Sequence, residues 1–183
     1  LCFNSFLNNK IYVEGIKNID KTDIDNANKL GYKIKLIGFA ELLNKNIYQR
    51  VHPTLIKHDS YIAGIDGVLN AVIVDGHPVG QSIIQGEGAG PAATTSALIS
   101  DISSILRGNV KFPFSLSRKE RKKLNFNNIE ERYFSAYLRF EVKDKPGVLS
   151  DITNIFSKNK VSIKRLLQTP FKKTNNSSII VIS

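Results

Sequence analysis

The stretch Ile83 to Asp101, IIQGEGAGPAATTSALISD, carries an apolar strand into a glycine-rich turn and then into a helix. Gly86, Gly88 and Gly90 can take positive φ, and they let another molecule approach the main chain without a Cβ in the way. The hydroxyl side chains from Thr94 to Ser96 are predicted to cap a helix from Ser96 to Leu106, whose positive dipole end faces the turn. The pattern therefore predicts a polar or anionic group beside this turn.

The glycine cluster has a second interpretation, because glycines also occur where a strand and a helix simply pack closely. The dinucleotide fingerprint G-x-G-x-x-G is absent, since Gly90 follows Gly88 by only two residues. The turn is therefore not a Rossmann phosphate loop. Glu87 is expected to face solvent rather than to act as a base, and Pro91 removes one N–H donor from the turn.

The composition indicates a globular piece of a longer protein. The 183 residues are 42% hydrophobic and include no methionine. No apolar segment reaches the length of about 20 residues that a membrane helix needs, and one cysteine cannot form an internal disulfide. We expect a soluble, cytoplasmic protein that does not bind a membrane.

The net charge of +10 raises the possibility of nucleic-acid binding. The distribution of the charge argues against it, because only Arg118 to Lys123 form a basic run and the other lysines are scattered. Aromatic residues do not alternate with basic ones in a stacking pattern. A basic nucleic-acid-binding module therefore remains only a third hypothesis, and we expect no nucleic-acid partner.

The first part of the chain is predicted to have an α+β fold, a mixed sheet with helices. A hydroxyl group at Thr22 is expected to cap a short helix, and proline is expected to end or edge the strand that contains it. Asp75-Gly76 is predicted to be a two-residue hairpin turn. The expected elements are helices at Leu1 to Phe6 and Thr22 to Leu30, and strands at Tyr12 to Val13, Tyr32 to Ala40, Ile47 to Val51, Val68 to Val74 and Pro78 to Gln85.

The last part of the chain reads as strand, helix, strand, strand, which is the front of a ferredoxin-like βαββαβ unit. Its helix has an apolar face of Leu149, Ile152, Ile155 and Phe156. The expected elements are strands at Tyr133 to Val142, Val161 to Thr169 and Ile179 to Ile182, and a helix at Val148 to Asn159. We predict a first domain over residues 1–107, a polar linker over 108–131 and a C-terminally truncated second domain over 132–183.

Four segments together resemble homoserine dehydrogenase. They are Glu14-Gly15-Ile16 with Asp23-Ile24, the AxxLGYxIKLIGFA pattern from Ala27 to Ala40, RVHPTLI from Arg50 to Ile56, and GEGAG with TTSALISD. The segment RFEVKDKPGVLSDI, Arg139 to Ile152, resembles an ACT domain, a small amino-acid-sensing module. Together the two resemblances cover nearly the whole chain.

The first resemblance implies an NAD(P)-dependent oxidoreductase that interconverts L-homoserine and L-aspartate 4-semialdehyde, on the shared route to threonine, methionine and isoleucine. The family's nucleotide-binding domain and catalytic residues lie upstream of Leu1, so we assign no catalytic residue here and expect the chain alone to be inactive. The resemblance implies that Gly90 lies near the nicotinamide end of NADP or NAD. Gly88 would shape the same turn, and Thr94 would support it from the helix.

The second resemblance implies an effector site at Asp144, Gly147, Val148 and Leu149, with threonine as the family's usual inhibitor. A regulatory fold that binds nothing remains a competing reading. The family also suggests a homodimer or a higher homo-oligomer. A stand-alone amino-acid-binding regulatory protein is the alternative hypothesis.

No metal site is predicted, because the three histidines have no metal-ligand spacing. They are His52, His58 and His77, and structural or surface roles are expected for all three.

Overall fold

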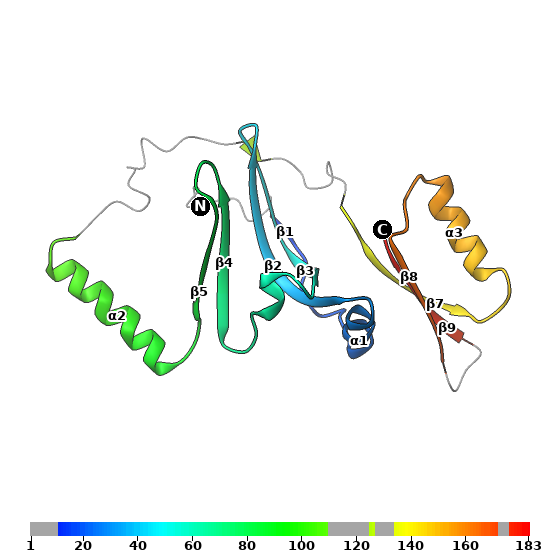
Figure 1. The fold of residues 1–183 in the computed structure, drawn as a ribbon, viewed down its shortest axis with the longest axis horizontal. Coiled ribbons are helices and arrows are strands. Elements are labelled where there is room, and N and C mark those ends of the chain that lie inside the picture. Colours follow the sequence, from blue (N-terminus) through cyan, green and yellow to red (C-terminus); the bar gives the residue numbers. More distant parts are fainter. Residues whose placement is uncertain (1–10, 110–124, 127–133, 172–175) are drawn as a thin grey trace. The chain divides into compact units, whose positions relative to one another are not determined.

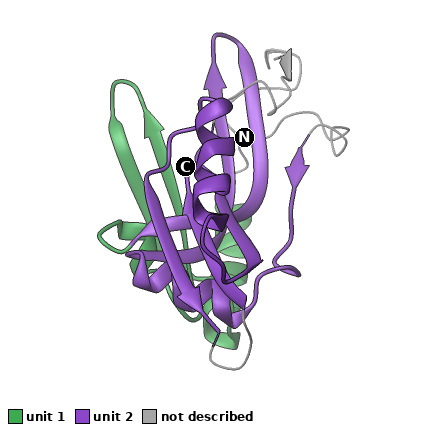
Figure 2. Cartoon of the chain, turned by 90° about the vertical axis from the view of Figure 1, so that its right-hand side faces the viewer, with its two compact units in different colours: residues 1–9, 58–125 green, residues 10–57, 126–183 purple. Residues whose placement is uncertain are grey.

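The computed structural model describes residues 11–109, 125–126, 134–171 and 176–183 (Figure 1). The chain divides into two compact units, coloured separately in Figure 2. Among the described residues, one unit contains 58–109, and the other contains 11–57 together with the C-terminal ranges 134–171 and 176–183. The mixed α+β fold predicted from the sequence is confirmed, and each unit is considered by itself below.

A long antiparallel hairpin dominates the N-terminal part of the second unit. Its strands are β2 (Tyr32–Leu43) and β3 (Asn46–Lys57), which pair along their whole lengths. The two connecting residues, Asn44 and Lys45, have φ values of 49° and 67°, as the tight turns of twisted hairpins require. The short strand β1 (Tyr12–Val13) runs parallel to β3, and β6 (Asn125–Phe126) also pairs with β3.

Of the two alternatives expected for Pro53, the end of its strand is wrong, because β3 continues to Lys57, and the edge position stays a prediction. Pro53 lies inside β3 and pairs with Leu36 of β2. In an antiparallel pair only alternate residues direct their N–H group at the same neighbour, so a proline can occupy one of the other positions. The strand β1 pairs with β3 at Arg50 and Val51, before the proline is reached.

The first helix, α1 (Lys21–Lys29), begins one residue before the predicted Thr22, and its cap is a carboxylate rather than a hydroxyl. The Asp20 side chain accepts from the Asp23 N–H at 3.1 Å, and the Asp23 side chain accepts from the Asp20 N–H at 3.1 Å. This reciprocal capping box satisfies two N–H donors that the first helical turn leaves open. Asp23 is 3% exposed, so this carboxylate is buried as well as bonded.

The C-terminal sheet consists of β7 (Tyr137–Lys143), β8 (Arg165–Pro170) and β9 (Asn176–Ile182), with α3 (Val148–Lys158) between the first two strands. The strand β9 lies in the middle and is antiparallel to both neighbours, so β7 and β8 are parallel to each other. This is the predicted βαββ order. Strands β7 and β8 begin four residues later than predicted, and β9 begins three residues earlier. Ile155 is 60% exposed, so it does not belong to the buried face of α3.

The core of the second unit lies on the C-terminal sheet. Residues Ser177 to Ile182 of β9 are all buried, which means that both faces of this central strand are covered. Leu30, at the end of α1, forms a buried cluster with Ile180 and Ile182. Tyr32 and Leu55 of the long hairpin, and Tyr137 and Leu167 of the C-terminal sheet, pack against that cluster. The N-terminal elements and the C-terminal sheet therefore share one core.

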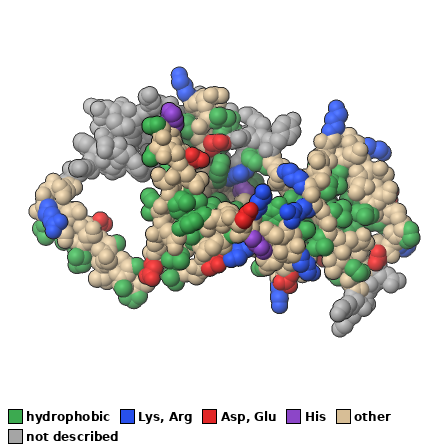
Figure 3. Space-filling model, viewed as in Figure 1, with side chains coloured by type: hydrophobic (Ala, Val, Ile, Leu, Met, Phe, Trp, Pro, Cys, Tyr) green, Lys and Arg blue, Asp and Glu red, His purple; other side chains and the backbone are tan. Residues whose placement is uncertain are grey.

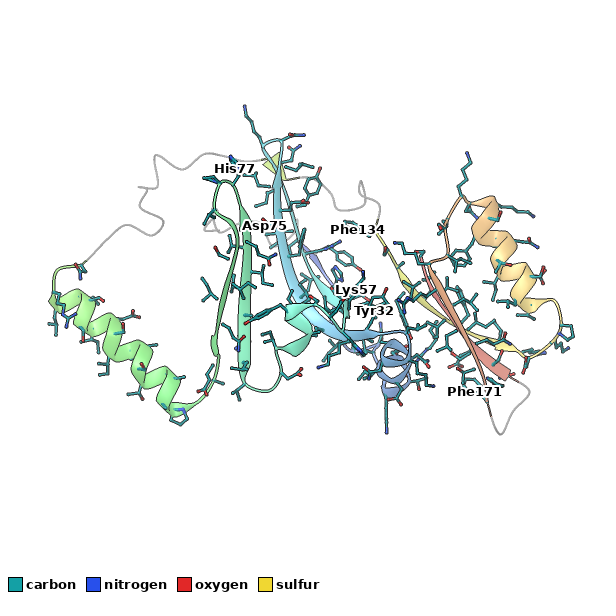
Figure 4. All side chains as sticks on the ribbon, viewed as in Figure 1. Tyr32, Lys57, Asp75, His77, Phe134 and Phe171 are labelled. Atoms are coloured by element: carbon teal, nitrogen blue, oxygen red, sulfur yellow. The ribbon has the colours of Figure 1, made fainter. Side chains whose placement is uncertain are left out.

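The other unit contains a hairpin of β4 (Leu69–Gly76) and β5 (Gly80–Glu87), followed by α2 (Pro91–Leu106), with a short 3-10 helix η2 (Tyr61–Gly64) ahead of it. The predicted hairpin is confirmed, but its predicted turn is wrong. Asp75 and Gly76 belong to the ladder, paired with Gln81 and Gly80, so the loop is His77 to Val79. Figure 4 labels Asp75 and His77 near this tip.

Large apolar side chains remain exposed along the hairpin and α2. Hydrophobic residues over the hairpin are visible in Figure 3. Val72 is 59% exposed, Ile84 is 67% exposed and Leu106 is 82% exposed. No helix within the described ranges is long and apolar enough to cross a membrane.

Two predictions lie wholly or mostly outside the described residues, namely the helix ending at Phe6 and the linker over 108–131. The domain boundaries stay a prediction.

Shortening a core residue of β9 should destabilise the second unit. We expect Ile180→Ala to lower the free energy of unfolding by about 2–5 kcal/mol, because Ile180 is fully buried and its loss leaves a cavity. Denaturant unfolding of the purified protein measures this. The matched control is Ile155→Ala on the exposed side of α3, which should change it by less than about 0.5 kcal/mol. Equal effects of the two substitutions would contradict the proposed core.

Candidate functional site

The glycine turn leads directly into α2, five residues earlier than the predicted start at Ser96. Gly90 is the N-cap, it offers no side-chain cap, and Pro91 occupies the first turn. Thr94 to Ser96 lie inside the helix, so the predicted hydroxyl caps are wrong. Proline suits the first helical position because its φ is already helical and the N–H that it lacks would have had no intrahelical partner.

Gly90 has φ 125° and ψ 150°, a conformation that residues with a side chain rarely adopt. A Cβ added there would meet nothing within 4 Å, so the space beside the residue is open. The Thr94 N–H donates to the Gly90 carbonyl at 3.1 Å and makes the first regular helical bond. The amides of Ala92 and Ala93 precede that bond, where a helix has no carbonyl to accept from them.

Gly88 is required for a different reason. A Cβ at Gly88 would lie 1.4 Å from Nδ2 of Asn70 and 2.6 Å from its Cγ. The Asn70 side chain, which projects from β4, therefore occupies the space that any larger residue at this position would need. The Gly88 N–H also donates to the Val68 carbonyl at 2.9 Å, which closes the end of the hairpin. Asn70 is exposed, and Glu87 is exposed as predicted.

A pocket of about 340 Å³ lies at the turn between β7 and α3. All four residues predicted as effector contacts line it: Asp144, Gly147, Val148 and Leu149. Lys143, Lys145 and Pro146 complete the turn side, and Gln168, Ser177 and Ile179 contribute from β8 and β9. The volume is within the range of small-molecule sites, about 300–1,000 Å³.

The charges of this pocket suit a zwitterion. Gly147 is the N-cap of α3 with φ 97°, and no side chain caps the helix. The first regular helical bond runs from the Asp151 N–H to the Gly147 carbonyl at 2.9 Å, so the amides of Leu149 and Ser150 precede it. These amides can receive a carboxylate, and the carboxylate of Asp144 can receive an ammonium group.

The polar side chains of the pocket are loosely linked to one another. Nε2 of Gln168 lies 3.4 Å from Oδ1 of Asp144 and 3.5 Å from Oγ of Ser177. Ser177, the second residue of β9, is fully buried. Both distances are long for hydrogen bonds, so these groups can turn toward a ligand at little cost.

A charged cluster joins the C-terminal sheet to the start of α1, and the sequence reading gave it no role. Nη1 of Arg139 on β7 lies 2.9 and 2.8 Å from the two carboxylate oxygens of Asp20, and 3.1 Å from Oδ1 of Asp23. The Tyr137 hydroxyl donates to the same Asp23 oxygen at 2.8 Å. The capping box of α1 is therefore held by two residues more than a hundred positions later in the chain.

Two further arginines make contacts within the same unit. Arg165 of β8 donates to the Leu30 carbonyl at the end of α1, and its guanidinium lies 5.3 Å from the centre of the Tyr32 ring. The guanidinium of Arg50 on β3 lies 4.8 Å from the ring centre of Phe39 and 4.0 Å from that of Phe134. Figure 4 labels Tyr32 and Phe134.

The cluster shifts the pKa values of Asp20, Arg139 and Tyr137. The hydrogen bond from Arg139 lowers the pKa of Asp20, and that same bond raises the pKa of Arg139. Burial raises the pKa of Tyr137 strongly, and the hydrogen bond to Asp23 raises it further because deprotonation would place two negative charges together. Arg139 and Asp20 are therefore both charged, and Tyr137 is protonated, across the neutral pH range.

Within the described part of the chain, no group of three or more His, Cys, Asp or Glu residues could hold a metal ion. Nδ1 of His52 lies 2.7 Å from the Pro53 carbonyl and 3.3 Å from Oγ1 of Thr54. These contacts fit the structural role predicted for this histidine.

The βαββ topology, with a pocket at the turn between strand and helix, defines an ACT-like module joined to a second α+β element. The family model described as ACT domain matches residues 136–183. The model described as homoserine dehydrogenase matches residues 2–103, more than half of the chain. The chain belongs to the homoserine dehydrogenase family.

Relatives and solved structures agree with this assignment. The chain is 37% identical over 171 residues to homoserine dehydrogenase of Helicobacter pylori, and 35% identical over 178 residues to that of Neisseria gonorrhoeae. These alignments cover 93% and 94% of this chain, but 40% and 41% of the relatives. The crystal structure of a homoserine dehydrogenase from Thiobacillus denitrificans aligns with a TM-score of 0.80 and 33% identity over 95% of this chain and 40% of that one. The chain thus spans about 40% of the length of the relatives it matches.

Enlarging Gly88 should be harmful because of Asn70. We expect Gly88→Ala to lower the free energy of unfolding by about 0.5–1 kcal/mol, less than the usual cost of overpacking a core, because Asn70 is exposed and its amide end can turn away. Adding Asn70→Ala should recover most of that loss, since it removes the atoms that the new methyl group would meet. Thermal unfolding of the four proteins of this cycle gives the coupling. If the double substitution behaves as the sum of the single ones, Asn70 does not explain Gly88.

The hydroxyl of Tyr137 should make stability sensitive to alkaline pH. Its pKa is raised on folding, so the stabilisation is fully present below the usual value of 10.0 and is lost as pH rises above it. We expect Tyr137→Phe to be less stable than the wild type at pH 8, and the difference to shrink between pH 10 and 11. Urea unfolding at several pH values measures it. The control Tyr61→Phe removes an exposed hydroxyl that donates to Gln85 and should not alter this pH dependence.

Proposed function

We propose that this chain contains part of the substrate and dimerisation domain, followed by the amino-acid-sensing domain, of an NAD(P)-dependent homoserine dehydrogenase. Such an enzyme interconverts L-homoserine and L-aspartate 4-semialdehyde. The observation that carries the proposal is the family membership of residues 2–103, followed by an ACT domain. The curated relatives are named homoserine dehydrogenases, and this chain covers about 40% of each. We therefore expect the chain by itself to be inactive, with the catalytic groups supplied by a preceding part of a longer protein.

The glycine turn fits a nicotinamide cofactor, NADP or NAD. Gly90 exposes main chain toward open space, and no side chain caps the start of α2. The amides of Ala92 and Ala93 are suited to a polar or anionic group, whereas Pro91 can donate nothing. We propose that Gly90 contacts the cofactor, that Gly88 holds the shape of the turn, and that Thr94 anchors the helix side through its bond to Gly90. When bound, the cofactor supplies or accepts the hydride.

The role of these residues is to position rather than to react. A backbone surface without Cβ atoms lets a flat ring lie close to the main chain, and a close fit excludes water from a hydride transfer. The strained φ of Gly90 is tolerated only by glycine, which keeps the surface flat. No residue of this chain is proposed as a general acid or base.

We propose that the pocket at the β7–α3 turn binds a free amino acid, with threonine as the first candidate. The α-carboxylate would accept from the amides of Leu149 and Ser150, and the α-ammonium group would bind Asp144. Gly147 and Val148 would form the wall at the start of the helix, as their position in the pocket lining suggests. Lys143 and Lys145 add positive charge near the carboxylate.

The remaining assignments follow from the family. They are a place in the biosynthesis of threonine, methionine and isoleucine, a homodimer or higher homo-oligomer, and a cytoplasmic location. All three stay predictions. The exposed apolar residues of α2 and the β4–β5 hairpin are compatible with burial in a larger assembly.

The deciding experiment follows oxidation of NADPH and of NADH by the full-length protein with L-aspartate 4-semialdehyde, with and without L-threonine. Turnover that threonine suppresses is expected. Asp144→Ala should raise the half-inhibitory threonine concentration by about tenfold, a loss of about 1.4 kcal/mol of binding. The control Asp151→Ala removes a nearby carboxylate that does not line the pocket and should leave that concentration within about twofold.

The possible failures separate the hypotheses. A folded full-length protein without turnover but with threonine binding would favour the stand-alone regulatory protein. Turnover without any threonine binding would leave the dehydrogenase assignment standing and remove the effector assignment.

A further inference from the structure

The pocket and the α1 contacts occupy opposite ends of the same two strands. Strand β7 carries Arg139 near its start and ends at Lys143, which lines the pocket. Strand β8 begins with Arg165, which donates to the end of α1, and three residues later presents Gln168 to the pocket. Each strand therefore touches a ligand site at one end and α1 at the other.

The strand between them makes the sheet a stiff connection. β9 pairs with β7 from Tyr137 to Lys143 and with β8 from Arg165 to Pro170. Its residues from Ser177 to Ile182 are buried. Because β9 is close-packed and hydrogen-bonded on both sides, a displacement of β7 or β8 is transmitted through it to the other strand.

The helix is held at both ends in addition to its buried side, which carries Asn26 and Ala27. Arg139 and Tyr137 bind the two capping carboxylates at its start, and Arg165 binds the Leu30 carbonyl at its finish. Leu30 also lies in the cluster with Ile180 and Ile182 of β9. Directly after it the chain enters β2 at Tyr32, beneath the guanidinium of Arg165. A displacement of the C-terminal sheet would therefore move both α1 and the start of β2 at Tyr32.

We propose that α1 is the element through which occupancy of the β7–α3 pocket reaches the rest of the protein, with Arg139 and Arg165 as the coupling residues. This rests on the proposed function in one respect, because it takes the ligand to be a free amino acid. The two arginines do not line the pocket, so they act by position and not by binding the ligand. The ligand can bias α1 only by binding one arrangement of the sheet more tightly than another.

The test uses the full-length protein with L-threonine as the probe, and compares Arg139→Gln and Arg165→Gln with the wild type. Calorimetry gives the affinity for threonine, the NADPH assay gives inhibition, and hydrogen exchange reports the amides of α1. Lys158→Gln is the control, because it removes a positive charge from the last turn of α3, away from α1.

In the wild type, threonine should inhibit and should change exchange in α1. In both arginine variants we expect threonine still to bind, while α1 exchange no longer responds to it and inhibition weakens by about 5- to 150-fold, the usual range of allosteric coupling. By reciprocity, the effect of substrate on threonine affinity should disappear in the same variants. If the arginines had a purely structural role, the substitutions would raise α1 exchange by the same amount with and without threonine. The change that threonine causes in α1 exchange would then persist.

The proposal is overturned if Arg139→Gln and Arg165→Gln retain wild-type inhibition and wild-type changes in α1 exchange. If either variant fails to fold, Tyr137→Phe replaces it, since it removes one bond to Asp23 and leaves the ion pairs in place. A wild type that binds no threonine would remove the effector assignment and this relay with it. Threonine binding with normal inhibition in the variants would remove the relay alone.

Discussion

The attachment of the C-terminal sheet to α1 is the constraint on which the second unit depends. Asp23 is 3% exposed, and a buried carboxylate is costly unless its charge is matched. Here Arg139 supplies the opposite charge, and the Asp23 carboxylate also accepts from the Tyr137 hydroxyl and the Asp20 N–H. Because Arg139 and Tyr137 belong to β7, the capping carboxylates are neutralised only when the C-terminal sheet is in place. Removing Arg139 alone would leave two carboxylates at the start of α1 without their cation.

This arrangement makes the C-terminal sheet part of the core of the second unit. The buried cluster of Leu30, Ile180 and Ile182 combines residues from both ends of the chain. The stacking of Arg50 against Phe39 and Phe134 adds a contact ahead of β7. A pocket built on such a sheet differs from one in an appended domain, because any change in the sheet alters contacts that the rest of the unit needs.

Several features were predictable because they depend on neighbouring residues. The helix α3, the β4–β5 hairpin and the glycine turn before α2 each depend on residues within a short stretch of the chain, and each is present. The residues predicted as effector contacts, Asp144 to Leu149, form one continuous turn that lines the pocket, and their role as contacts stays a prediction. The carboxylate cap was missed although its signal was available, namely the three-residue spacing of Asp20 and Asp23 before an apolar pattern. The start of α2 was missed because the proline at Pro91 was weighed as a lost donor and not as a favoured first residue.

The sequence by itself determined the local elements, the family and the two turns where ligands are expected, because each of these is encoded by residues close together in the chain. Only the tertiary structure decided that Asn70 fills the space beside Gly88, and that Arg139, Tyr137 and Arg165 hold α1. The partners in that second set lie 119, 114 and 135 positions apart. No periodicity or motif relates residues at such separations. Their meeting follows from which faces of the sheet and helix are buried together, and that is a property of the packed fold.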